Sequence, residues 1–184
     1  YITWLCLFHR DKNVLIVATK LATAANLVKK VKTILKHLPT WLKISDLVVD
    51  NKNSIEMTNG SQVKASSTSG DAGRSEAVTL LVIDEAAIVR WANQIWAAAF
   101  PTLSTGGSAI VNSTPYGMGN WYHKQWVDAC ANGNNFNAIR LKWNMHPERD
   151  MEWYIKMANS LGKRRTAQEI DGDFLSSGFN VFDL

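Results

Sequence analysis

The sequence has only two cysteines, no internal repeat, no low-complexity linker and no long uninterrupted apolar run. Cys6 lies in the apolar run ITWLCLF and Cys130 at the end of an expected helix, so neither a disulfide framework nor a zinc site has support. Apolar stretches such as 79–83 and 86–89 are interrupted by charge far short of the ~20 residues that a membrane-spanning helix needs. No basic segment followed by an apolar core and a cleavage site is present. We therefore expect neutral thiols in a reducing cytoplasm, no membrane embedding, and no export signal within these residues.

Composition favours one compact core and is compatible with an anionic partner. The chain has 184 residues, of which 46% are hydrophobic, and this is enough for a single domain of ordinary size. The formal net charge is +4 and the pI about 9.1, and a positive surface attracts polyanions such as nucleic acid. Many basic proteins of this size bind no nucleic acid, so the charge alone leaves the partner open.

Expected strands and helices alternate along the chain. The run 14–18, VLIVA, is continuous and β-branched, which is typical of a strand buried on both faces of a parallel sheet. Apolar residues at helical spacing predict a helix over 21–38, and Asn59-Gly60 between extended segments predicts a hairpin. Further strands are expected at 78–83, 109–112 and 136–141, and further helices at 93–100, 120–130, from about 147, and over 164–170. This order predicts an α/β fold with three αβα layers around a mainly parallel sheet.

The segment TLLVIDEAA, residues 79–87, places two adjacent carboxylates at the end of a buried strand. Ligands of open α/β sheets bind at the carboxyl ends of the strands, and this is the pattern of a Walker B motif followed by a catalytic glutamate. In that chemistry Asp84 holds the magnesium that bridges nucleotide phosphates, and Glu85 orients and deprotonates the attacking water. An ordinary strand that ends in a solvated acidic turn fits the same residues.

The segment IVNSTPYG, residues 110–117, follows one strand-helix unit later. Ser113 and Thr114 come directly after an expected buried strand, so their hydroxyls are expected at the same sheet edge as Asp84 and Glu85. Hydroxyls in this place can sense the γ-phosphate and pass its loss to a neighbouring element. A Ser-Thr-Pro turn that caps the next helix is the alternative, and it becomes less favoured once the acidic pair is considered with it.

Basic residues have two interpretations each. Arg74 lies in the polar loop SSTSGDAGRSEA, where an arginine can stabilise a transferring phosphoryl group in its own subunit or in a neighbour, although a plain surface role fits equally. Lys29, Lys30, Lys32 and Lys36 lie between the apolar positions of the first long helix. We favour a solvated face for these lysines over a contact with DNA.

An ordered set of segments resembles the large terminase subunits, the DNA-packaging motors of tailed bacteriophages and herpesvirus-like viruses. The set covers nearly the whole chain and consists of DKNVLIVATK, NSIEMTNGSQVKASSTS, DAGRSEAVTLLVIDEAA, NSTPYGMGNWYHKQW and RTAQEIDGDFLSSGFNVF. The family places a hairpin before an arginine-containing loop, then the Walker B strand with its catalytic glutamate, then a coupling motif of the Ser/Thr-Thr-Pro type. On this resemblance Asp84 takes the magnesium role, Glu85 the catalytic base role, and Ser113 and Thr114 the coupling role.

The resemblance carries expectations about the fold, the cofactors and the partners. It implies a P-loop NTPase fold of the ASCE type, with ATP and Mg2+ as cofactors, and residues 1–175 as a partial motor domain that leads through 176–184 toward a nuclease domain. It also implies double-stranded viral DNA, a portal protein and a small terminase subunit as partners, and a homo-oligomeric ring. The expected location is the host cytoplasm, transiently docked on the procapsid portal, and not the mature virion.

Two departures from the family pattern limit what these residues alone can do. The sequence has no GxxxxGK[ST] segment, which the family places before the helix that residues 1–8 would continue, so we expect the first strand and the Walker A loop to be missing by truncation. It also ends before the acidic cluster of a nuclease. We therefore expect ATP hydrolysis in the full-length protein and an inactive fragment. The alternatives are another ASCE-class ATPase, such as a helicase, and a non-catalytic nucleic-acid-binding module.

Overall fold

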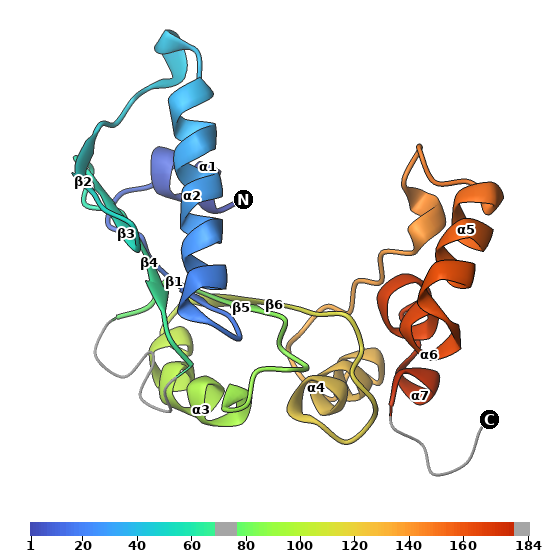
Figure 1. The fold of residues 1–184 in the computed structure, drawn as a ribbon. Coiled ribbons are helices and arrows are strands. Elements are labelled where there is room, and N and C mark those ends of the chain that lie inside the picture. Colours follow the sequence, from blue (N-terminus) through green and yellow to red (C-terminus); the bar gives the residue numbers. More distant parts are fainter. Residues whose placement is uncertain (69–76, 179–184) are drawn as a thin grey trace. The chain divides into compact units, whose positions relative to one another are not determined.

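The structure, a computed structural model, describes residues 1–68 and 77–178 and divides into two compact units (Figure 1). The first unit, residues 1–112, holds the whole β-sheet, and the second unit, residues 113–184, is helical where it is described. This division lies inside the span 1–175 expected to form the motor domain, and the boundary expected at 175 stays a prediction. Within the described residues, no helix combines the length and the apolar character needed to cross a membrane.

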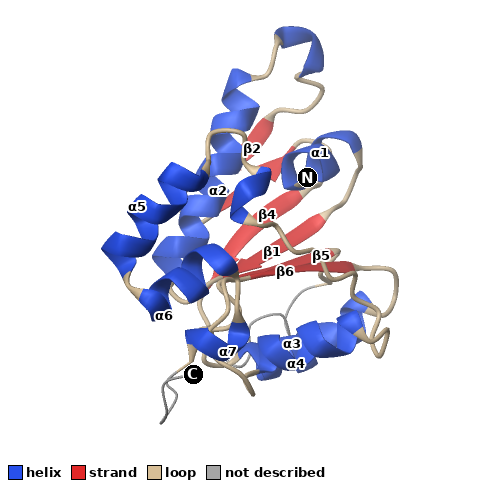
Figure 2. Ribbon diagram, turned by 90° about the vertical axis from the view of Figure 1, so that its right-hand side faces the viewer, coloured by secondary structure: helices blue, strands red, loops and turns tan. Residues whose placement is uncertain are grey.

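The sheet of the first unit is mixed, with its parallel part in the centre. Its elements are α1 (Ile2–Phe8), β1 (Asn13–Val17), α2 (Leu21–His37), the 3-10 turn η1 (Thr40–Leu42), β2 (Leu47–Asp50), β3 (Ser54–Met57), β4 (Gln62–Ser66), β5 (Leu80–Asp84), α3 (Ala92–Leu103) and β6 (Ser108–Asn112). The strand order is β2-β3-β4-β1-β5-β6; Figure 1 labels all of these strands, and Figure 2 shows β2, β4, β1, β5 and β6 from another side. The pairs β1–β4, β1–β5 and β5–β6 are parallel, whereas β2–β3 and β3–β4 are antiparallel. The expected mainly parallel α/β sheet is confirmed.

The central strands are apolar on both faces because helices cover both sides of the sheet. Val14 and Ile16 of β1 share one hydrophobic core with buried residues of α1 and α2. Successive side chains of a strand point to opposite faces, so Leu15 and Val17 face away from that core. The helix α3 packs on β5, and Figure 1 shows it across the sheet from α1 and α2. The first unit therefore has the three expected layers.

The Asn59-Gly60 turn joins β3 and β4, as expected, and also holds the end of α1. Gly60 has φ +82, a conformation that favours glycine, and a Cβ at this position would lie 2.2 Å from Asp11 Oδ1, so a larger residue would strain the turn and displace the Asp11 side chain. Asn59 Nδ2 donates to the carbonyl oxygens of Cys6 at 2.8 Å and His9 at 3.2 Å. The side-chain hydroxyl of Ser61 donates to the same His9 carbonyl at 2.9 Å. The turn thus satisfies carbonyl groups that the last turn of a helix leaves without partners.

Where it is described, the second unit consists of short helices, three of which have a side-chain N-cap. They are α4 (Trp121–Cys130), the 3-10 turn η2 (Trp143–Met145), α5 (Met151–Leu161), α6 (Lys163–Thr166), the π-helical turn η3 (Ala167–Asp171) and α7 (Phe174–Ser177). Asn120, Asp150 and Asp173 accept hydrogen bonds from the first-turn amides of α4, α5 and α7. The hydrogen bond from Ser176 lowers the pKa of the Asp173 carboxyl. Phe174 contacts the rings of Tyr122, His123 and Trp126, so aromatic side chains of α4 pack against α7.

One expected strand is wrong. We expected a strand at 136–141, but the structure has none there. Ile139 is 73% exposed and Leu141 79% exposed, and among the described residues no strand pairs with this segment. A strand is defined by hydrogen bonds to a neighbour, so the pattern alone does not make one. Conversely, β2 was not expected, because its four residues carry no alternating signal of their own.

Candidate functional site

Polar side chains from three neighbouring parallel strands meet at the carboxyl edge of the sheet in the first unit. Asp84 is the last residue of β5, and Glu85 follows it. Asn112 is the last residue of β6 and is paired in register with Asp84. Thr19 follows the end of β1 by two residues. Because β1, β5 and β6 are parallel, their carboxyl ends lie side by side, which is where ligands of open α/β sheets bind.

Glu85 is held in an unusual backbone conformation by the turn that follows β5. Its φ is +54, in the left-handed region, which costs a residue with a Cβ roughly 1–2 kcal/mol. The backbone amides of Ile88 and Val89 donate to the Glu85 carbonyl oxygen and close the turn. Glu85 Oε2 accepts a hydrogen bond of 2.8 Å from the Thr19 hydroxyl. Strained backbone of this kind concentrates at functional sites, and here it directs an exposed carboxylate toward the neighbouring strand β1.

The two oxygens of Asp84 have different surroundings. Its Oδ1 accepts hydrogen bonds from the Glu85 backbone amide at 3.1 Å and from Asn112 Nδ2 at 2.6 Å. No donor of the described residues bonds its Oδ2. The Asp84 side chain is half-buried, so it is oriented by protein on one side and accessible on the other.

The site suits a metal ion that is shared with phosphate groups rather than one held by protein alone. Among the described residues, no group of three or more His, Cys, Asp and Glu side chains is close enough to hold a metal. Mg2+ typically binds one or two carboxylates, with waters and substrate phosphates filling its other positions. The Asp84 Oδ2, with no donor bonded to it, fits this requirement.

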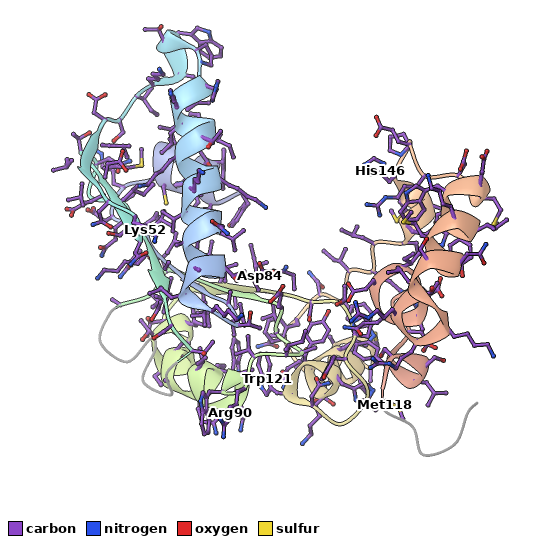
Figure 3. The ribbon with its side chains drawn as sticks, in the orientation of Figure 1. Lys52, Asp84, Arg90, Met118, Trp121 and His146 are labelled. Carbon is purple, nitrogen blue, oxygen red and sulfur yellow. The ribbon has the colours of Figure 1, made fainter. Side chains whose placement is uncertain are left out.

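A groove of about 440 Å3 runs along α2 and includes Asp84 in its lining. Figure 3 labels Asp84 beside the N-terminal half of α2. The other lining residues all come from α2: Thr23, Asn26, Leu27, Lys29, Lys30 and Thr33. Lys29 and Lys30 give the groove two ammonium groups and Thr23, Asn26 and Thr33 give it neutral polar groups, a combination that suits an anionic ligand.

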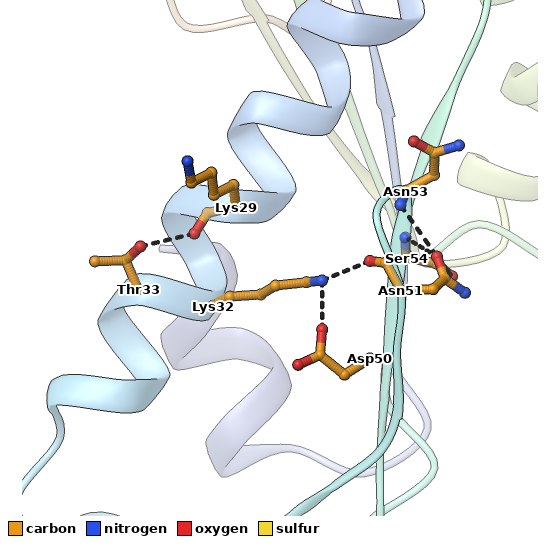
Figure 4. Close-up of polar contacts among 7 residues, drawn as sticks. All are labelled: Lys29, Lys32, Thr33, Asp50, Asn51, Asn53 and Ser54. Carbon is orange, nitrogen blue, oxygen red and sulfur yellow. Dashed lines mark hydrogen bonds and ion pairs between the residues drawn. The ribbon is translucent and has the colours of Figure 1, made fainter.

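The lysines of α2 do not share one role. Lys32 Nζ makes an ion pair with Asp50 and also donates to the Asn51 carbonyl oxygen (Figure 4). Asn51 in turn accepts hydrogen bonds from the amides of Asn53 and Ser54 through its side chain. Lys32 therefore anchors the β2–β3 turn to α2, whereas Lys29 and Lys30 line the groove. The expectation of a uniformly solvated lysine face is wrong for Lys32.

Two expected site residues lie in the second unit, and one lies outside the described residues. The Ser113 hydroxyl donates to the Thr114 carbonyl oxygen at 2.7 Å, and the Tyr122 hydroxyl donates to the Ser113 carbonyl oxygen at 3.3 Å. Burial raises the pKa of Tyr122, which keeps this donor protonated. These contacts hold the backbone at 113–114 in place. The coupling role of Ser113 and Thr114 stays a prediction. Arg74 falls in the range 69–76, outside the described residues.

Thr19 and Asn112 are site residues that our sequence reasoning did not single out. Asn112 ends a strand of the parallel sheet, as Asp84 does, and Thr19 lies two residues after one, so the signal was present in VLIVAT and AIVN, although β6 is partly exposed along its length. What the sequence lacks is the strand order. Only the placement of β5 between β1 and β6 brings both side chains against the acidic pair.

Comparison with known sequences finds no matching family model, and it finds relatives among the large terminase subunits. The large terminase subunits of Thermus phage G20c and Thermus virus P23-45 are each 27% identical to the chain over 128 residues. The match covers 59% of this chain and 25% of each relative, so the chain matches about a quarter of their length.

Solved structures with the same fold cover nearly the whole chain. The ATPase domain of the large terminase of Thermus phage P74-26 has a TM-score of 0.69 and 19% identity, over 94% of this chain and 80% of that domain. The large terminase of another thermophilic bacteriophage, solved with ADP, has a TM-score of 0.72 and 14% identity, over 95% of this chain and 43% of that protein. The resemblance to large terminase subunits and the P-loop NTPase fold of their ATPase domains are both confirmed.

Proposed function

We propose that this chain is the ATP-hydrolysing part of a phage large terminase subunit, and that the full-length protein uses it to drive double-stranded DNA into procapsids. The observation that carries the proposal is the Asp84-Glu85 pair at the carboxyl edge of β5. The Asp84-Glu85 pair belongs to a fold shared with large terminases, one of which has been solved in complex with ADP and with ATP-γ-S.

In this proposal the chain's own residues position the water and the phosphates. Mg2+, bound through Asp84 and the phosphates, would neutralise charge on the nucleotide. Glu85 orients the attacking water and accepts its proton. The water oxygen bonds to the γ-phosphorus while the bond from that phosphorus to the bridging oxygen of ADP breaks. Thr19 limits the orientations of the Glu85 carboxylate through the 2.8 Å hydrogen bond.

Three further residues have roles in the proposal, two of them from the family resemblance and the third, Arg74, from the chemistry of its loop. Ser113 and Thr114 would sense the loss of the γ-phosphate and pass it on as movement, because they follow β6 directly. Arg74 would stabilise charge on the transferring phosphoryl group, either in its own subunit or across a subunit interface.

The proposed partners are those of a packaging motor. The exposed lysines Lys29 and Lys30 of α2 offer ammonium groups to the phosphates of double-stranded DNA. The curated relatives are much longer than the matched region, and this supports a longer parent protein, to which the family resemblance gives a nuclease domain. A homo-oligomeric ring on the portal protein, contact with the small terminase subunit, and a transient location on procapsids in the host cytoplasm complete the proposal.

The decisive experiment compares ATP hydrolysis by the full-length protein with that of its Glu85→Gln variant. This change keeps the size of the side chain and removes the base, so turnover should fall at least ~100-fold with nucleotide affinity retained. Glu56→Gln is a matched control, because Glu56 is an exposed glutamate on β3 of the same sheet. Unchanged turnover in Glu85→Gln would refute the proposed base, whereas absence of ATP hydrolysis by the unmodified full-length protein would support a non-catalytic module.

A further inference from the structure

Asn112 and Asp84 are linked in a way that the family resemblance did not lead us to expect. They are the last residues of β6 and β5 and are direct partners in the parallel ladder. The Asn112 amide nitrogen donates to Asp84 Oδ1 at 2.6 Å. We propose that Asn112 is a positioning residue for the metal of the nucleotide, because its amide fixes which oxygen of Asp84 is presented. This inference rests on the function proposed above.

The hydrogen bonds that Asp84 accepts from described residues all end on one oxygen of its carboxylate, which leaves the other oxygen for a metal ion. Oδ1 accepts from the Glu85 amide as well as from Asn112, so most of its acceptor capacity is used. Oδ2 has no donor among the described residues and is the oxygen left for a metal ion. A carboxylate with one oxygen held in this manner cannot turn without breaking both hydrogen bonds. The arrangement therefore favours single-oxygen coordination in one orientation.

Fold stability does not account for the contact. The backbone ladder between β5 and β6 already aligns the two strands over five residue pairs. Asn112 is exposed and Asp84 only half-buried, so water can replace the hydrogen bond at little cost. A bond that adds little to folding but orients a metal-binding oxygen acts as an outer-shell contact, and losing such a contact typically costs about 10–100-fold in metal affinity.

The test measures metal binding directly. In the full-length protein saturated with ADP, free Mn2+ is followed by electron paramagnetic resonance as Mn2+ is titrated. Asn112→Ala and Asn112→Leu both remove the donor, and the second keeps a similar side-chain size. We expect the dissociation constant for Mn2+ to rise about tenfold in both variants, with the affinity for metal-free ADP unchanged. Asn93→Ala, at an exposed position of α3, is the control.

The outcomes separate this inference from the function that it rests on. Unaltered Mn2+ affinity in both Asn112 variants, with tight Mn2+ binding by the unmodified protein, would overturn the role of Asn112 alone. Absence of any Mn2+–ADP binding by the unmodified protein would overturn the proposed function and this inference with it. A tenfold loss in only the Asn112 variants would support both.

Discussion

Replacing Thr19 by valine tests whether the hydrogen bond to Glu85 orients the proposed base. Valine has the shape of threonine without the hydroxyl, so the carboxyl end of β1 should keep its structure. The bond joins a half-buried hydroxyl to an exposed carboxylate at 2.8 Å, and bonds of this kind contribute about 0.5–1.5 kcal/mol net. If that energy serves to orient Glu85, its loss corresponds to a fall in kcat of about two- to tenfold.

The assay is steady-state ATP hydrolysis by the full-length protein, with kcat and KM determined separately. Thr19→Val should lower kcat and leave KM unchanged, because Thr19 contacts the base and not the nucleotide-binding groups. Thr19→Ser retains the hydroxyl and should keep most of the activity. A kcat in Thr19→Val that equals or exceeds that of the unmodified protein would refute the reasoning. In that case the bond would restrain Glu85 in a resting position rather than prepare it for the reaction.

Two further predictions concern charge and burial. The double change of Lys29 and Lys30 to alanine should weaken binding of double-stranded DNA and lower its salt slope by about two, as measured by fluorescence anisotropy. Lys32→Ala should leave DNA affinity unchanged, because Lys32 is bound to the β2–β3 turn. A loss of DNA affinity in Lys32→Ala as large as that in the double variant would contradict the separate roles of these lysines. Burial raises the pKa of the Cys6 thiol from 9.0 to about 11, so iodoacetamide at a pH of about 8 should label Cys130 and spare Cys6 in mass spectra. Rapid labelling of Cys6 at a pH of about 8 would refute its burial. Since the pKa of the Cys6 thiol is higher in the folded protein than in the unfolded one, the free energy of unfolding should fall as pH rises from 9.0 toward about 11.

Strands and helices with strong local signals could be predicted from the sequence. The continuous β-branched run at 14–18 and the apolar run at 78–83 became the central strands β1 and β5, because only a strand covered on both faces tolerates such runs. The helical spacing of 21–38 became α2, and Asn59-Gly60 became a hairpin turn. The segment 136–141 was also predicted to be a strand and forms none, because pairing depends on a neighbour that local sequence does not specify.

Asp84 and Glu85 could also be predicted as site residues from the sequence, because an acidic pair at the end of a buried strand is a local feature. The groups around them were decided by tertiary structure. Thr19 is 66 residues from Glu85 and Asn112 is 28 residues from Asp84, and the strand order β1-β5-β6 alone brings them within hydrogen-bonding distance. The different roles of Lys32 and Lys30 arise in the same way, because neighbouring positions of α2 face a β-turn and a groove. Local patterns fix which chemical groups a strand or helix carries, and packing between elements distant in sequence fixes what each group contacts.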